Sequence, residues 1–193
     1  MMEPFRVAVY GPRACGACRR QLLLGGDQLA ELANWLEFVT WPTDQQVDLL
    51  FLDGKLDDLT VGDWYLVSQH ARQAVALGRC AGESLPRDML LPIVYGCAPT
   101  ADELIDAILR LASGRSLPEY NASVCVDCKR QGLTCVMPQM PCQGPITRQG
   151  CDARCPRLGV GCRGCRGRFK AARLQAFERV LQRYGWTERD LVN

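Results

Sequence analysis

The sequence predicts an α/β fold over its first 118 residues, followed by a small module that cannot build an ordinary apolar core. Two observations lead to this prediction. Short apolar runs alternate with helical spacing up to about residue 117, which is typical of a parallel sheet wrapped by helices. Beyond that point glycine and proline are frequent, and eight of the 12 cysteines fall between Cys125 and Cys165.

The expected strands are short apolar runs that end near glycine or proline, at 5–10, 36–41, 47–52 and 90–95. Helical spacing covers 19–35, with a break at Gly25-Gly26, and 63–77, whose last residues 74–77 also fit a short strand. Thr100 and Glu103 form a capping box that opens a further helix over 104–112. The expected architecture is a flavodoxin-like parallel sheet, in which sites lie outside the carboxyl ends of the strands.

We divide the chain into three parts by composition. Residues 1–118 form the flavodoxin-like domain, residues 119–168 form a cysteine-rich, ferredoxin-like domain, and residues 169–193 form a C-terminal helix and tail. Apolar residues recur at helical spacing from Phe169 to Tyr184, which predicts an amphipathic helix packed on the protein itself or on a partner.

Composition excludes several classes of protein. A net charge of +2 argues against a dedicated nucleic-acid binder. No stretch of 18 uncharged apolar residues exists, so no membrane span is expected, and the first residues lack the regions of a secretory signal. We therefore expect a cytoplasmic protein. In a reducing compartment, many cysteines indicate metal binding or catalysis rather than disulfides.

The 12 cysteines are the candidate metal ligands. Cys15 and Cys18 follow the first expected strand, Cys97 follows the last, and Cys80 follows a helix and a turn, so all four can meet at one edge of the sheet. The other eight, spaced C-x2-C-x6-C-x6-C-x8-C-x3-C-x6-C-x2-C, are Cys125, Cys128, Cys135, Cys142, Cys151, Cys155, Cys162 and Cys165. The only histidine, His70, lies in a helical stretch without a neighbouring C-x-x-C, and we do not expect it to be a ligand.

The cysteine count favours iron–sulfur clusters over zinc. Twelve is three times four, and a cubane cluster takes four thiolates. Zinc also uses C-x-x-C pairs, but these spacings are not two regular zinc ribbons. Cys155-Pro156 matches the Cys-Pro that closes bacterial ferredoxin runs. Nine Lys or Arg against two acids between residues 121 and 170 would offset the negative charge of two such clusters.

These motifs resemble the small, electron-transferring subunit of cytoplasmic nickel–iron hydrogenases, of the F420-reducing, methyl-viologen-reducing and sulfhydrogenase branch. That family is related to the 20 kDa cluster subunit of respiratory complex I. The first half contributes Cys15-Gly16-Ala17-Cys18, Leu50-Phe51-Leu52-Asp53-Gly54, Gly78-Arg79-Cys80-Ala81 and Gly96-Cys97-Ala98-Pro99. The second half contributes Val124-Cys125-Val126-Asp127-Cys128, Pro141-Cys142-Gln143-Gly144-Pro145-Ile146-Thr147, Gly150-Cys151, Cys155-Pro156 and Cys162-Arg163-Gly164-Cys165.

The resemblance implies three [4Fe–4S] clusters and no catalytic residue in this chain. Cys15, Cys18, Cys80 and Cys97 would hold the proximal cluster, and the eight later cysteines would hold the medial and distal clusters. Which four share a cluster stays open; ferredoxin-style crossing would join Cys125, Cys128 and Cys135 to one late cysteine. The implied partners are a nickel–iron-type large subunit and a flavin- or cluster-bearing electron-transfer subunit.

Two alternatives stay open. Only 16 residues separate Cys80 from Cys97, where the family usually carries a longer segment, and Asp53 stands where the family commonly has Glu. The chain could therefore carry electrons in a related oxidoreductase complex that is not a hydrogenase. A zinc-stabilised interaction module without a redox role is the second alternative.

Overall fold

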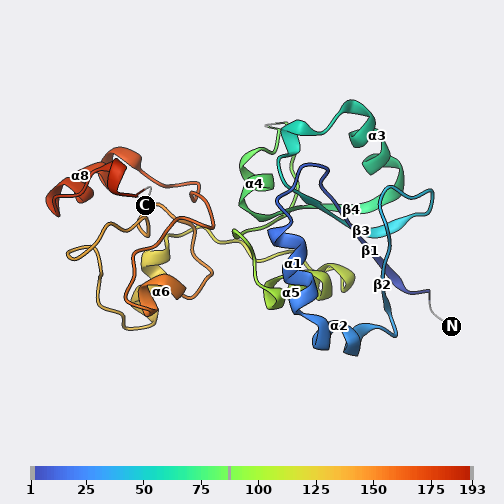
Figure 1. The fold of residues 1–193 in the computed structure, drawn as a ribbon, viewed down its shortest axis with the longest axis horizontal. Coiled ribbons are helices and arrows are strands. Elements are labelled where there is room, and N and C mark those ends of the chain that lie inside the picture. The colour runs from blue at the N-terminus through green and yellow to red at the C-terminus, as the bar shows by residue number, and fades with distance from the viewer. Residues whose placement is uncertain (1–2, 87, 192–193) are drawn as a thin grey trace. The chain divides into compact units, whose positions relative to one another are not determined.

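The computed structural model describes residues 3–86 and 88–191. The chain forms two compact units, the first ending at Leu117 and the second beginning at Pro118. Figure 1 shows that the first unit holds all the labelled strands.

The first unit is built on a five-stranded parallel sheet. Its strands are β1 (Phe5–Tyr10), β2 (Leu36–Phe38), β3 (Val47–Asp53), β4 (Ala71–Leu77) and β5 (Ile93–Val94). They lie in the order β2-β1-β3-β4-β5, and every pair is parallel. This is the flavodoxin-like order, so the predicted α/β fold is confirmed.

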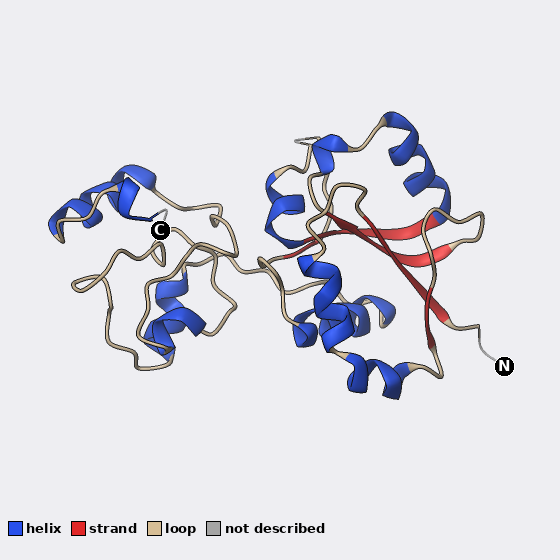
Figure 2. Cartoon of the chain, viewed as in Figure 1, coloured by secondary structure: helices blue, strands red, loops and turns tan. Residues whose placement is uncertain are grey.

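Helices cover both faces of the sheet (Figures 1 and 2). One face carries α1 (Ala17–Leu24), α2 (Gly26–Leu32) and α5 (Ala101–Ala112), and the other carries α3 (Val61–His70), α4 (Gly78–Glu83) and the 3-10 turn η1 (Leu56–Asp58). The expected break at Gly25 separates α1 from α2. A Cβ on Gly25 would lie 2.8 Å from Ile105 Cδ1, so α5 packs closely on this junction.

Strand β3 is the centre of the core. Leu49 and Phe51 face the layer of α1 and α5, whereas Leu50 and Leu52 face the layer of α3 and α4. All four side chains are fully buried. Successive residues of a strand point to opposite faces, so an uninterrupted apolar run is what a strand covered on both sides requires.

The helix expected over 63–77 is wrong in its second half. Helix α3 ends at His70, and Ala71–Leu77 is strand β4, of which only 74–77 fitted a strand in the sequence. Val75, Ala76 and Leu77 are fully buried between β3 and β5. Pairing with two neighbouring strands outweighs the high helical propensity of this segment, in which every residue except Val75 is a good helix former.

Two other strands are shorter than expected. Strand β2 ends at Phe38 instead of residue 41, and β5 covers only Ile93–Val94 instead of 90–95. Proline has no N–H to donate to a ladder, and Pro92 pairs with β4 only through its carbonyl, which accepts from Ala76 N at 2.9 Å.

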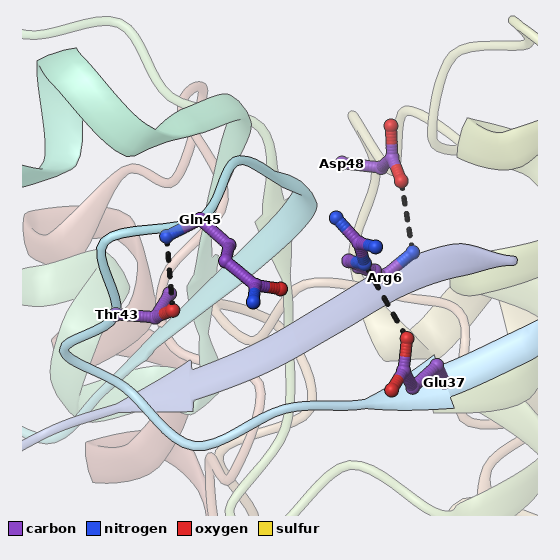
Figure 3. Close-up of polar contacts among 5 residues, drawn as sticks. All are labelled: Arg6, Glu37, Thr43, Gln45 and Asp48. Carbon is purple, nitrogen blue, oxygen red and sulfur yellow. Dashed lines mark hydrogen bonds and ion pairs between the residues drawn. The ribbon is translucent and has the colours of Figure 1, made fainter. Parts of the chain in front are cut away.

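Polar contacts join the strands at the amino-terminal edge of the sheet (Figure 3). The backbone N–H of Arg6 donates to Asp48 Oδ2 at 2.8 Å, and its guanidinium Nε donates to Glu37 Oε2 at 3.3 Å. In the loop before β3, Gln45 N donates to Thr43 Oγ1 at 3.1 Å. The two contacts of Arg6 tie β1 to both of its neighbours at the edge opposite the carboxyl ends.

The second unit contains little regular structure. Its helices are α6 (Val124–Arg130), α7 (Arg154–Arg157), α8 (Leu174–Arg183) and the 3-10 turn η2 (Glu188–Leu191). The C-terminal helix begins at Leu174, later than the expected Phe169. Its Phe177 and Leu181 are buried against Val124 and Met137. The Trp186 indole donates to Met137 O at 2.8 Å, so this tail packs on its own unit.

Within the described residues, no helix is long and apolar enough to cross a membrane.

Truncation of Phe51 tests the position of the core. We expect Phe51→Ala to lower the free energy of unfolding of the first unit by about 3–5 kcal/mol, because the ring is fully buried. Phe38→Ala is the matched control, since 45% of that side chain is exposed on β2. Denaturant unfolding measures both, and equal losses would contradict the assignment of β3 as the central strand.

Candidate metal centres

Four cysteines lie beyond the carboxyl ends of the parallel strands. Cys15 lies in the loop after β1, Cys18 in α1, Cys80 in α4 directly after β4, and Cys97 shortly after β5. The sequence predicted this placement because parallel strands present their carboxyl ends at one edge. Cys15, Cys80 and Cys97 are exposed, whereas Cys18 is buried.

Close backbone contacts hold these loops together. A Cβ on Gly78 would lie 2.8 Å from Cys18 Sγ, so glycine at the start of α4 leaves room for this sulfur. Arg79 N donates to Gly96 O at 2.7 Å and joins the loops that carry Cys80 and Cys97. Burial, followed by the neighbouring Cys97 and Cys15, raises the pKa of the Cys80 thiol. The thiols at this edge are therefore close enough to affect one another.

Asp53 is the buried acid of this group. Its side chain lies at the end of β3, 4% exposed, with Oδ2 3.8 Å from Arg19 Nε. Burial raises the pKa of Asp53, while a hydrogen bond with Cys18 and the charge of Arg19 lower it. Burial and then Asp53 raise the pKa of Cys18 well above its usual range. Asp53 thus touches both a cysteine and the helix that carries it.

The second unit places Cys125, Cys128, Cys135 and Cys142 near one another. The pKa of Cys128 is raised to about 11 by burial and then by Cys125, Cys142 and Cys135. The pKa of Cys125 is raised by burial, with smaller contributions from Cys142 and Cys135. Two of these cysteines, Cys125 and Cys128, lie on α6.

The remaining four cysteines lie later in the same unit. Burial raises the pKa of Cys162 to about 12, and the neighbouring Cys142 and Cys165 add to this rise. Cys155 lies in α7 and is among the thiols that raise the pKa of Cys142. Cys151 begins the bend that leads into α7.

Backbone N–H groups point at the Cys142 sulfur. Gly144 N donates to Cys142 Sγ at 3.4 Å, and Cys162 N donates to it at 3.2 Å. A Cβ on Gly144 would lie 3.3 Å from Cys142 Sγ and 3.6 Å from Cys125 Sγ. The glycine therefore keeps open the space between two sulfurs. Such N–H···S bonds favour a thiolate and tune the potential of a cluster.

Sequence reasoning missed three polar residues that shape this unit. Asp127 is buried and accepts from Gly150 N at 2.8 Å, which ties α6 to the segment before Cys151. Thr147 is buried, and its hydroxyl donates to Gln143 O at 2.7 Å. Arg166 is buried 4.9 Å from the centre of the Tyr120 ring. Asp127 inside a C-x-x-C was the one available signal.

All 12 cysteines lie within the described residues and carry free thiols. Within that part of the chain, no three Cys, His, Asp or Glu side chains are gathered as they would be around one metal ion. A cubane places its four thiolates on four different irons, so its ligands need not meet at a single point.

The sequence of this chain is similar to the sequences of several hydrogenase subunits. The chain is 25% identical to the delta subunit of sulfhydrogenase 2 of Pyrococcus furiosus over 205 aligned positions, which cover 84% of this chain and 86% of that subunit. It is 30% identical over 108 positions to an F420-non-reducing hydrogenase subunit of Methanothermobacter thermautotrophicus, covering 45% of this chain and only 34% of that relative. The resemblance to hydrogenase subunits is confirmed. No protein-family model matches the chain.

Solved structures show the same fold at low identity. The actinobacterial-type NiFe-hydrogenase of Ralstonia eutropha H16 matches with a TM-score of 0.63 and 13% identity, over 100% of this chain and 83% of that chain. The [NiFeSe]-hydrogenase of Dm. baculatum matches with a TM-score of 0.58 and 15% identity, over 86% and 95% of the two chains. The chain therefore has the fold found in a subunit of these hydrogenases.

Gly11 sets the approach of the Cys15 loop to β3. A Cβ at this position would lie 2.1 Å from Asp53 O, a backbone atom that cannot move freely. We expect Gly11→Ala to lower the free energy of unfolding by about 1–3 kcal/mol. The control is Gly26→Ala, where no atom lies within 4 Å and no loss is expected. Equal urea midpoints for the two variants would contradict this packing.

Metal uptake by the cluster-free chain should depend on pH. With a pKa raised to about 11 for Cys128 and about 12 for Cys162, both thiols keep their protons at pH 8 and must release them to bind metal. The apparent affinity for Cd²⁺ should therefore rise with pH, by up to about tenfold per pH unit for each proton displaced, until the pH passes these values. Calorimetry in buffers of different ionisation heat counts the protons. An affinity independent of pH would contradict the raised pKa values.

Proposed function

We propose that this chain is the iron–sulfur electron-transfer subunit of a nickel–iron hydrogenase complex. It would relay electrons between a catalytic large subunit and a further redox subunit, and would carry no catalytic residue of its own. The observation that carries the proposal is the presence of 12 free cysteines, four of them beyond the carboxyl ends of the parallel strands and eight in the second unit, on a fold shared with hydrogenases.

The residues present fit [4Fe–4S] clusters. Every candidate ligand is a cysteine, and a [4Fe–4S] cluster is held by four cysteine thiolates. Gly78 and Gly144 lack the Cβ that would crowd Cys18 and Cys142. Backbone N–H donors already face one sulfur. The bound clusters would supply one-electron oxidation and reduction; the chain would orient them, exclude water and set their potentials.

We assign the ligands to three sets of four. Cys15, Cys18, Cys80 and Cys97 would hold the cluster at the sheet edge, nearest the catalytic subunit. In the second unit one set would be Cys125, Cys128, Cys135 and Cys142, supported by their mutual effects on pKa. The other set would be Cys151, Cys155, Cys162 and Cys165. We propose this grouping in place of the ferredoxin-style crossing, because a Cβ on Gly144 would lie 3.3 Å from Cys142 Sγ and 3.6 Å from Cys125 Sγ, so these two sulfurs border the same space.

The surroundings of the cysteines in the second unit act on the thiolate in two opposite directions. Arg166 is held against Tyr120 and donates from Nε to Gln149 O at 3.0 Å, so a fixed cation lies in the interior of the second unit. Burial raises every resolved thiol pKa in this unit. Burial and N–H···S bonds act in opposite directions on a cluster potential, since the first penalises negative charge and the second stabilises it.

Metal and sulfide analysis of the anaerobically purified complex tests the function. About 12 iron and 12 acid-labile sulfide per copy of this chain are expected for three cubanes, together with nickel in the complex. Iron and sulfide without nickel in an active complex would favour the related non-hydrogenase oxidoreductase, which the short segment between Cys80 and Cys97 motivates. Zinc without sulfide would overturn the proposal in favour of an interaction module.

Single cysteine substitutions test the grouping. Cys128→Ala and Cys142→Ala should abolish the same electron paramagnetic resonance signal, whereas Cys165→Ala should abolish a different one. Each variant should lose up to about four irons. His70→Ala is the control and should keep all the iron, because His70 ends α3 and is not assigned as a ligand. Loss of the same signal in Cys128→Ala and Cys165→Ala would restore the crossed arrangement.

A further inference from the structure

The second unit exposes a leucine on a loop between two cysteines. Leu158 is 80% exposed, and Val160, two residues on, is 43% exposed. Both lie between Cys155 and Cys162, which the proposed function assigns to one cluster. Exposed leucines are ordinary when they are scattered, so the loop matters only if its structure and surroundings set it apart.

The loop is held in place by its own backbone. Leu158 N and Val160 N both donate to Cys155 O, at 3.0 and 3.1 Å, and Gly159 N donates to Pro156 O at 2.9 Å. The Arg157 guanidinium donates to Asp152 O at 2.9 Å. Pro156 and Gly161 are buried on either side of the exposed residues. A preformed apolar tip loses little conformational entropy when a partner covers it.

Positively charged residues flank this tip along the chain. Arg154, Arg157 and Arg163 are all exposed, whereas the only acid between residues 151 and 168 is Asp152. A central apolar contact with charged residues around it is the usual arrangement of a small protein interface. The charge fits an acidic partner and would steer its approach.

The tip is also joined to a candidate cluster ligand. The Leu158 and Val160 amides share the carbonyl of Cys155, so a protein seated on Leu158 would lie one hydrogen bond from a ligand residue. We infer that Leu158, Val160 and the surrounding arginines form the docking surface for an acidic electron-transfer protein. This inference rests on the proposed function, because it requires a cluster at Cys155.

The step at this surface is the transfer of one electron. One electron would pass between the partner's redox centre and the cluster that Cys155 would help to hold, so that one centre is oxidised by one electron and the other is reduced by one. No bond is made or broken and no proton is needed. Weak, transient contact suits such exchange, and small electron-transfer interfaces are of this kind.

Anaerobic stopped-flow mixing tests the docking surface. The cluster-loaded full chain is mixed with an acidic plant-type [2Fe–2S] ferredoxin, in the direction that the measured potentials make downhill. We expect a second-order rate at least about tenfold higher at about 50 mM than at about 500 mM salt. Leu158→Ala should lower the low-salt rate about fivefold or more. Leu23→Ala, an equally exposed leucine on α1 at 80%, should leave it unchanged.

Two charge-reversal variants distinguish an effect of charge at the docking surface from an effect of the net charge of the chain. Arg157→Glu should lower the rate and flatten its salt dependence. Arg179→Glu on α8 is the matched control, since Arg179 is also exposed and also donates to a backbone carbonyl, that of Gln175. Equal effects of the two reversals, or none from Leu158→Ala, would overturn the docking surface.

Dithionite reduction and iron analysis distinguish failure of the docking inference from failure of the proposed function. Every variant should keep the dithionite-reducible absorbance and the iron content of the parent chain. A chain that contains neither iron nor acid-labile sulfide carries no cluster, which would overturn both proposals. If Leu158→Ala instead loses co-purification of the catalytic subunit at an unchanged ferredoxin rate, the loop belongs to that interface and the docking inference is wrong.

Discussion

The parallel pairing of β3 with β1 and β4 is the constraint on which the first unit depends. Parallel pairing directs the carboxyl ends of three strands to one edge, where Asp53, the Cys15 loop and the start of α4 meet. It also buries β3 on both faces, so the strand is almost wholly apolar until Asp53. The same geometry therefore fixes the core and gathers four cysteines from distant parts of the chain.

The second unit obeys a different constraint. Its apolar cluster is small. Two of the buried members are the cysteines Cys142 and Cys162, and a third, Val124, directly precedes Cys125. Long loops connect short helices, and backbone hydrogen bonds such as Gln143 N to Cys162 O at 2.9 Å join segments far apart in sequence. A unit of this kind gains much of its stability when its cysteines bind metal, since metal binding and folding are coupled.

Local signals in the sequence were reliable where one physical effect dominated. The capping box of Thr100 and Glu103 is present at the start of α5, because those side chains satisfy backbone N–H groups locally. The break at Gly25 is also present. Strand β4 was largely hidden within a helical pattern, because its burial between β3 and β5 is a property of the assembled sheet. Thr147 has no local pattern that marks it as buried, and Asp127 is marked only by its place inside a C-x-x-C.

The sequence by itself determined the α/β class of the first unit and the ligand type of the candidate centres, since both follow from periodicity, turn residues and cysteine spacing. Only the tertiary structure decided which cysteines influence one another, because proximity depends on loop paths that spacing does not encode. It likewise decided that Leu158 stays exposed on a fixed loop, while Leu181, an equally apolar residue, is buried. Burial is set by packing partners, and these are distant in the chain.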